Sequence, residues 1–220
     1  MKNIFKSSIG KKIGMALSGV FLIVFLTQHF IINITSVFSE DIFNMLSHFM
    51  GNNPLVQFIL QPVLIAGVLF HFVMGFVLEW QNRKARPVSY AMYKGSRNSM
   101  FVSRNMIISG IVILSFLVLH FYDFWVPEMD YKYIQSLPED PTRYYEELIH
   151  KFENPVRVGL YCLSFIFLAL HLVHGLASST QSLGTNNKYS SAIEKISYAF
   201  GIVIPLGFCF IALYHFFIHL

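Results

Sequence analysis

Five long apolar stretches alternate with polar segments along the chain. They lie at about residues 15–37, 56–80, 106–125, 158–178 and 197–218. Each is near the ~20 residues that a helix needs to cross a bilayer. Lipid offers no partner to backbone polar groups, so a five-span chain must cross as helices. The pattern therefore predicts an all-α integral membrane bundle of five transmembrane helices, with residues 1–220 as one membrane domain.

The polar segments between these stretches are expected to be loops. Residues 39–54 contain a Gly-Asn-Asn-Pro turn, 81–104 are strongly basic, 127–155 are acidic and rich in proline and tyrosine, and 179–194 form a short turn. The basic segment at the beginning leads into an apolar run that is longer than a signal peptide needs and ends in no small-residue cleavage site. We therefore expect the first apolar run to be retained as a helix.

Lysine and arginine predict the orientation of the bundle. Twelve of the 16 basic residues fall in the N-terminal segment and in the second and fourth polar segments, which share one side of the membrane. Cytoplasmic loops carry the excess of lysine and arginine. The N-terminus is therefore expected in the cytoplasm and the C-terminus outside.

Composition agrees with a membrane protein and narrows its chemistry. Hydrophobic residues make up 55% of the chain and charged residues only 13%, which is too apolar for an ordinary soluble domain. The net charge of +4 comes from short loops, so no nucleic-acid partner is expected. Cys162 and Cys209 both lie in apolar helices, far apart in sequence, and indicate neither a disulfide framework nor a thiolate metal site.

Histidines inside four of the apolar stretches are the candidate functional residues, because an ionisable group within a membrane helix is costly. At ~1.5 Å of rise per residue, His29 and His120 both fall in the outer half of the membrane. His71 and His171, on the descending helices, both fall in the inner half. We call His29 and His120 the outer pair, and His71 and His171 the inner pair.

Two layers of paired imidazoles suit two six-coordinate haems stacked across the membrane, since bundle cores take cofactors from facing helices. Each inner histidine is followed four residues later by glycine, Gly75 or Gly175, which would let a flat macrocycle approach the backbone. Each outer histidine is preceded eleven residues earlier by serine, Ser18 or Ser109. These serines share the histidine face at the depth of the inner layer and could make room for the second haem.

The other histidines fit this scheme less well. His174 shares a face with His171 and is an alternative inner ligand. His215 lies in the fifth helix without a partner at its depth, and His48, His150 and His219 lie in loops or at the end of the chain. These last four are expected to be structural or interfacial, since a lone histidine can also serve as a hydrogen-bonding residue between membrane helices.

Almost the whole chain resembles the di-haem cytochrome b membrane anchor of succinate:quinone oxidoreductases, the single-chain, five-helix type used with menaquinone. The matching pieces are LTQHFIIN at 26–33, FNMLSHFM at 43–50, FHFVMG at 70–75, LH at 119–120 and LHLVHGL at 170–176. On this resemblance, the axial histidines of the family fall on His29, His71, His120 and His171. It also favours His171 over His174.

The resemblance implies a membrane anchor of succinate dehydrogenase or fumarate reductase in the bacterial cytoplasmic membrane. A flavoprotein subunit and an iron–sulfur subunit would bind on the cytoplasmic side, and two haem b groups would pass electrons between the iron–sulfur subunit and quinone, expected to be menaquinone. The chain itself carries no dinucleotide-binding fingerprint and no cysteine cluster, so succinate chemistry would lie on the other subunits.

Supporting roles follow for several polar residues. The basic segment 81–104 is a candidate docking face, although it equally serves as a topology signal, and Arg97 and Arg104 are candidates to pair with haem propionates. Quinone chemistry moves protons and calls for a titratable group near the outer haem. The polar residues available there are Asn33, Glu40, His48 and Asp123, whereas Glu79, at the inner end of the second helix, is expected to be interfacial.

Two other functions remain open at this point. One is the cytochrome b subunit of a hydrogenase or formate dehydrogenase, which also uses buried histidines but spaces them differently. The other is a haem-free transporter with a histidine proton relay, which should show broken helices or repeats. Pro62 and Pro205 could break helices, but no inverted repeat is visible.

Overall fold

The computed structural model describes residues 7–84, 106–184 and 190–220, and within these ranges the chain is helical without any strand. Five described helices are long and apolar enough to cross a membrane. Their bounds are Ile9–Thr35, Val56–Lys84, Met106–Ile134, Pro155–Ser182 and Ser191–Ile218. The predicted all-α architecture with five membrane-spanning helices is thus confirmed, and the chain is a multi-pass membrane protein.

Several spans are built from consecutive helical segments. In chain order the elements are α1 (Ser8–Thr35), α2 (Glu40–Asn52), the π-helical turn η2 (Val56–Leu60), α3 (Gln61–Lys84), α6 (Met106–His120), η3 (Phe121–Trp125), α7 (Val126–Met129), η4 (Asp130–Ile134), α8 (Arg143–Phe152), α9 (Pro155–Ser182) and α10 (Ser190–Ile218). We call the end of the bundle where α1 finishes the outer end, and the opposite end the inner end.

The helices extend beyond the apolar stretches that predicted them. α1 begins at Ser8 rather than at 15, because the hydroxyl oxygen of Ser7 accepts a hydrogen bond from the Gly10 amide at 3.0 Å. α9 begins at Pro155 rather than at 158, where the Asn154 side chain caps the first turn. Hydropathy marks the part of a helix that crosses lipid, whereas capping determines where it starts.

Three other boundaries also make the helices longer than the apolar stretches. The second span runs to Lys84 instead of 80, the fourth to Ser182 instead of 178, and the fifth begins at Ser190 instead of 197. Only the end of the first span recedes, from 37 to Thr35.

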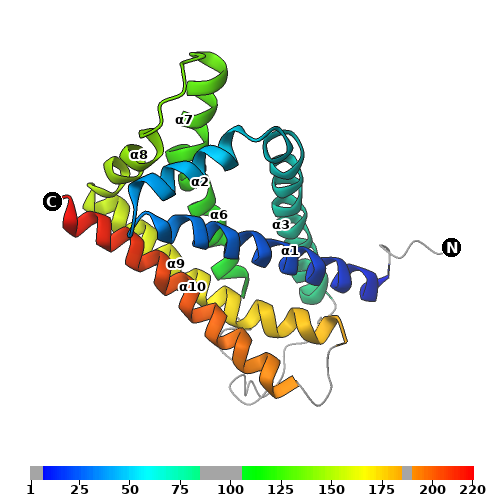
Figure 1. The fold of residues 1–220 in the computed structure, drawn as a ribbon. Helices are drawn as coiled ribbons and strands as arrows, with labels where there is room; N and C mark the ends of the chain where they lie inside the picture. The colour runs from blue at the N-terminus through cyan, green and yellow to red at the C-terminus, as the bar shows by residue number, and fades with distance from the viewer. Residues whose placement is uncertain (1–6, 85–105, 185–189) are drawn as a thin grey trace.

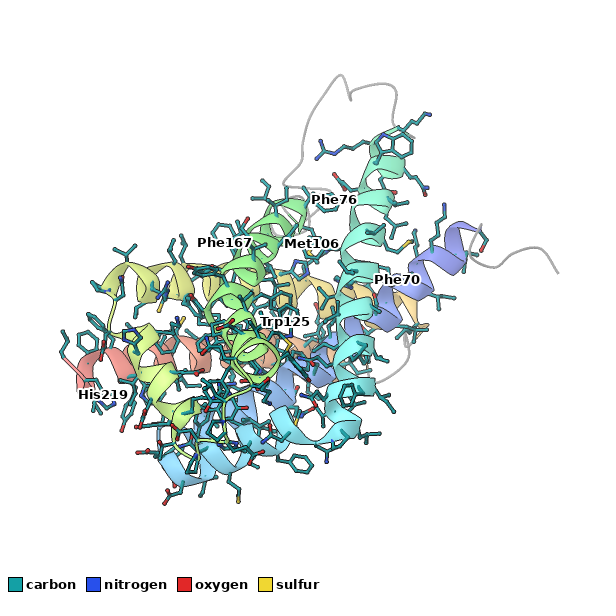
Figure 2. The ribbon with its side chains drawn as sticks, turned by 90° about the horizontal axis from the view of Figure 1, so that it is seen from above. Phe70, Phe76, Met106, Trp125, Phe167 and His219 are labelled. Carbon is teal, nitrogen blue, oxygen red and sulfur yellow. The ribbon has the colours of Figure 1, made fainter. Side chains whose placement is uncertain are left out.

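The third membrane-spanning helix does not end at Trp125, although the apolar pattern predicted that end. The helix continues through Pro127 to Ile134. Proline lacks an N–H and its ring collides with the carbonyl one turn earlier. The π-helical turn η3 directly before Pro127 widens the helix, and Val126 N–H bonds to the Phe121 carbonyl five residues back. Figure 2 labels Met106 at the start of this membrane-spanning helix and Trp125 in its outer part.

Segment 39–54, expected to be a loop, instead contains the helix α2. Ser39 caps it by accepting a hydrogen bond from the Ile42 amide at 3.3 Å, and Glu40 and Asp41 occupy its first turn, where negative charge is favourable. Segment 127–155 likewise contains α8. Both helices are short and amphipathic, and hydropathy over a membrane-length window does not detect such helices.

Four helices form a closed ring. α1 packs against α3 and α9, and α6 packs against the same two neighbours. α1 and α6 therefore face each other across the centre, as do α3 and α9. α10 lies outside the ring along α9, and in Figure 1 the first turn of α1 and the last turn of α10 lie at opposite ends of the molecule. The ring brings four interior helix faces to one axis.

A charged network closes the outer end. Arg143 of α8 forms ion pairs with Glu128 and, at 2.9 Å, with Glu147, while Lys132 lies 2.5 Å from Glu128. Burial acts to lower the pKa of Arg143, but its hydrogen bond to Glu128 and the charges of both carboxylates raise it overall. The guanidinium thus stays charged and joins α8 to the end of the third span.

Candidate functional site: two histidine pairs

The four interior histidines meet in two pairs inside the ring. The centroids of the His29 and His120 rings lie 5.7 Å apart at an interplanar angle of 87°. Those of His71 and His171 lie 6.3 Å apart at 67°. The pairing expected from depth is confirmed as geometry. Each pair joins diagonal helices, α1 with α6 and α3 with α9, so both pairs lie across the bundle axis.

This spacing suits a metal held between two imidazoles. If each imidazole bonds a shared metal through one nitrogen at about 2 Å, the two bonds and the two nitrogen-to-centroid distances together place the ring centroids about 6 Å apart. No group of three or more metal-ligating side chains occurs in the described part of the chain. A two-histidine site suits a metal that brings its own in-plane ligands, as haem iron does.

Each inner histidine is hydrogen-bonded to a serine on the neighbouring helix. The hydroxyl oxygen of Ser18 lies 3.0 Å from Nδ1 of His71, and that of Ser109 lies 3.2 Å from Nδ1 of His171. The serines therefore stand at the depth expected of them. The sequence suggested that they make room for a cofactor, whereas the structure also gives them a direct contact with the histidines.

The outer histidines are instead surrounded by aromatic rings. Phe25 stacks on His29 at 5.5 Å between centroids, and Phe116 stacks on His120 at 5.6 Å. Nδ1 of His120 is buried and has no hydrogen-bond partner among the described residues. The Asn33 amide nitrogen lies 3.4 Å from both ring nitrogens of His29 and donates instead to the His29 carbonyl at 2.8 Å. Sequence analysis did not identify either phenylalanine, although each lies four residues before its histidine.

The glycines expected beside the inner pair face methionine side chains. A Cβ at Gly75 would lie 3.6 Å from Cε of Met15, and one at Gly175 would lie 3.4 Å from Cε of Met106. The end of a methionine side chain is flexible and adapts to a new neighbour. The prediction that these glycines admit a macrocycle is compatible with this packing and stays a prediction.

Helix α3 packs more sparsely than its partners. None of its residues is buried, His71 included, whereas α9 has five buried residues. Figure 2 labels Phe70 where α3 meets α1, and its ring lies 3.4 Å from the position of a Cβ on Gly14. Protein interiors are normally close-packed. Helix α3 differs because it belongs to a membrane-spanning helix, whose outer face is available to lipid.

The contacts of His171, His174 and His215 distinguish their roles. His171, not His174, contacts both His71 and Ser109. His215 of α10 is completely buried and lies 2.9 Å from the hydroxyl of Ser36, which links α10 to the outer end of α1. That contact supports the structural role expected for His215.

The residues considered for quinone chemistry are not brought together. Asp123 is buried, accepts a hydrogen bond from the Tyr161 hydroxyl at 2.9 Å and lies 3.2 Å from Arg157 Nε. His48 donates through Nε2 to the Asp140 carbonyl at 3.0 Å, and Glu40 is exposed at the start of α2. Asp123 therefore joins the third span to the fourth, and sequence reasoning missed its two partners.

Two surface hollows lie near the outer end. A groove of about 530 Å³ runs between α1 and α2 and is lined almost entirely by apolar side chains. Gln28, next to His29, lines this groove and is exposed, and its amide donates to the sulfur of Met50 at 3.2 Å. The second hollow, of about 280 Å³, is polar and includes His48, Gln57 and Arg143.

Parts of the inner end lie outside the described residues. Arg97, Arg104 and most of the basic segment 81–104 are among them. Within the described part, Glu79 forms an exposed ion pair with Arg83 at 2.6 Å, consistent with an interfacial position.

No protein-family model, curated protein or solved structure matches the chain. Its function is therefore inferred from the residues and their geometry.

Proposed function

We propose that this chain is the membrane anchor and electron-transfer subunit of a succinate dehydrogenase or fumarate reductase. It would pass electrons between an iron–sulfur subunit and quinone through two stacked haem b groups. The observation that carries the proposal is the stacking of two histidine pairs at two depths, each contributed by diagonally opposite helices. The resemblance in sequence supplies the identity of the complex.

The roles of the chain follow from its side chains. Haem, when bound, supplies an iron that changes oxidation state by one electron. His29 and His120 would hold one haem, and His71 and His171 the other, through unprotonated ring nitrogens. Stacked aromatic rings around the outer pair exclude water and lower the local polarity.

The partners would occupy the inner end. The flavoprotein and iron–sulfur subunits would dock on the side that carries most lysine and arginine, which is cytoplasmic by the positive-inside rule. We place the complex in a bacterial cytoplasmic membrane. In succinate oxidation, electrons would enter at the inner pair and leave from the outer pair, and in fumarate reduction they would take the reverse path.

Quinone would bind in the groove between α1 and α2. The groove is mostly apolar and is lined in part by α1, the helix that carries His29. A sulfur atom is a weak hydrogen-bond acceptor, so the Gln28 amide is free to bond a carbonyl oxygen. An apolar pocket with one oriented polar group is a common form of ligand site. We expect menaquinone as the physiological quinone.

Haem quantification tests the proposal directly. The chain is purified with its soluble partners, and its haem is extracted and measured as the pyridine haemochrome. We expect two haem b groups per chain. A value near one or zero would overturn the two-layer assignment.

The same measurement separates the other functions. A transporter with a histidine proton relay would show no haem bands, and would need neither the pairing nor the spacing of the imidazoles. The cytochrome b subunit of a hydrogenase or formate dehydrogenase would bind haem, but succinate would not reduce it in the purified complex. Reduction of both haems by succinate would support the complex proposed here.

A further inference from the structure

Helices α1 and α6 carry the same residue pattern. Residues 15–29 and 106–120 both read Met-x-x-Ser-Gly, five residues, Phe, three residues, His. Helices α3 and α9 share the shorter pattern His-x-x-x-Gly, at 71–75 and 171–175. The ring therefore consists of two similar halves, α1 with α3 and α6 with α9.

The repeated residues make the same contacts in both halves. The first helix of each half directs its serine toward the inner histidine of the second helix, at 3.0 Å from Ser18 and 3.2 Å from Ser109. The glycine after each serine lies against the same imidazole. A Cβ at the first of these glycines would lie 3.6 Å from His71 Cε1, and one at the second would lie 4.0 Å from His171 Cε1. Two independent copies of one geometry make a chance contact a poor explanation.

The second contact of each serine hydroxyl indicates which atom donates to the other in these serine–histidine pairs. A serine hydroxyl has one hydrogen. Ser18 donates it to the Met15 carbonyl at 2.8 Å, and Ser109 donates it to the Met106 carbonyl at 2.9 Å. Carbonyl oxygens can only accept, so each hydroxyl oxygen is left to accept from the imidazole Nδ1–H. The remaining nitrogen, Nε2, is then unprotonated and carries the lone pair.

We propose that Ser18 and Ser109 are positioning residues for the inner haem. They hold His71 and His171 in the Nδ1–H tautomer, so that each Nε2 is presented as an iron ligand. A ligand histidine commonly donates its second N–H to a neighbouring group, which fixes the ring and makes the ligating nitrogen more basic. A more basic ligand stabilises ferric iron, so the serines also lower the midpoint potential of the inner haem. This inference rests on the proposed function.

Redox titration of the assembled complex tests the inference. Ser18→Ala, Ser109→Ala and the double variant remove the acceptors, and Ser18→Thr and Ser109→Thr keep a hydroxyl. Ser115→Ala is the matched control, because Ser115 also lies on α6 and its hydroxyl donates to a backbone carbonyl of the same helix, that of Ile111, at 3.1 Å. We expect each alanine variant to raise the midpoint potential of one haem and leave the other unchanged. The double variant should shift it further, and threonine should restore it.

The outcomes separate this inference from the function itself. A wild-type complex without haem would end the proposed function. Two haems with unshifted potentials in both alanine variants, an equal shift in Ser115→Ala, or a shift of the outer haem would overturn only the serine assignment. Selective loss of the inner haem in an alanine variant would support it, and joint loss of both haems would contradict it.

Discussion

The two histidine layers differ in what surrounds the rings. The inner imidazoles are each hydrogen-bonded to a serine on the neighbouring helix, at 3.0 and 3.2 Å. Each outer imidazole is stacked on a phenylalanine, and the buried Nδ1 of His120 has no hydrogen-bond partner in the described part of the chain. The same ligand type thus occupies a hydrogen-bonded layer and an aromatic layer.

In the proposed cytochrome, this difference would give two identical haems different potentials. The groups behind a ligand and the polarity of its surroundings both tune a bound metal. The inner layer would be tuned by hydrogen bonding, and the outer layer by low polarity and aromatic contact.

Replacing one of the four proposed haem ligands should have the largest effect, because it should remove the haem of one layer and leave the other. We expect His71→Ala or His171→Ala to remove the inner haem, and His29→Ala or His120→Ala to remove the outer haem. The pyridine haemochrome should fall from two haems per chain to one in each case. His174→Ala is the control and should retain both haems, because His171 makes the contacts with His71 and Ser109. Haem loss in His174→Ala with retention in His171→Ala would reverse the inner assignment.

A smaller effect is expected from Gln28→Leu, which tests the groove on the outer side. A neutral hydrogen bond contributes about 0.5–1.5 kcal/mol, so the KM for quinone should rise roughly two- to tenfold. Haem content and succinate oxidation with a soluble dye should not change. Gln57→Leu, in the neighbouring polar hollow, is the control. If Gln57→Leu raises the KM and Gln28→Leu does not, quinone binds in the polar hollow instead.

The smallest effect is expected from Asn33→Ala. The Asn33 amide lies 3.4 Å from both His29 nitrogens and is already committed to a backbone carbonyl. Redox titration should therefore show a smaller shift of the outer haem than Ser18→Ala causes in the inner haem. An equal or larger shift would mean that the outer layer is also tuned by hydrogen bonding, and the contrast between the layers would fail.

Much of the architecture was accessible from the sequence. Long apolar runs predict spans because lipid excludes unpaired backbone groups, and a helix rises by a constant amount per residue. Those two facts were enough to place His29 with His120 and His71 with His171, which the structure confirms as ring contacts. The repeated Met-x-x-Ser-Gly pattern was also present in the sequence and could have indicated two similar halves.

Helix boundaries and short amphipathic helices were less accessible. The apolar pattern predicts that the third helix ends before Pro127, but a π-helical turn accommodates the proline and the helix continues to Ile134. Likewise the pattern predicts a loop where α2 lies, because the polar residues of α2 lower the mean hydropathy although its caps favour a helix. In both segments, backbone and capping hydrogen bonds stabilise a helix that the apolar pattern does not predict.

The sequence by itself determined that five helices are long and apolar enough to cross a membrane, and it predicted which histidines pair, because both follow from local periodicity and from the thickness of the bilayer. Only the tertiary structure decided which helices are diagonal, that Ser18 and Ser109 reach the inner imidazoles, and that Asp123 pairs with Tyr161 and Arg157. Those contacts join residues 34 to 62 positions apart. They depend on how helix faces rotate and pack against one another, which spacing along a single helix does not specify.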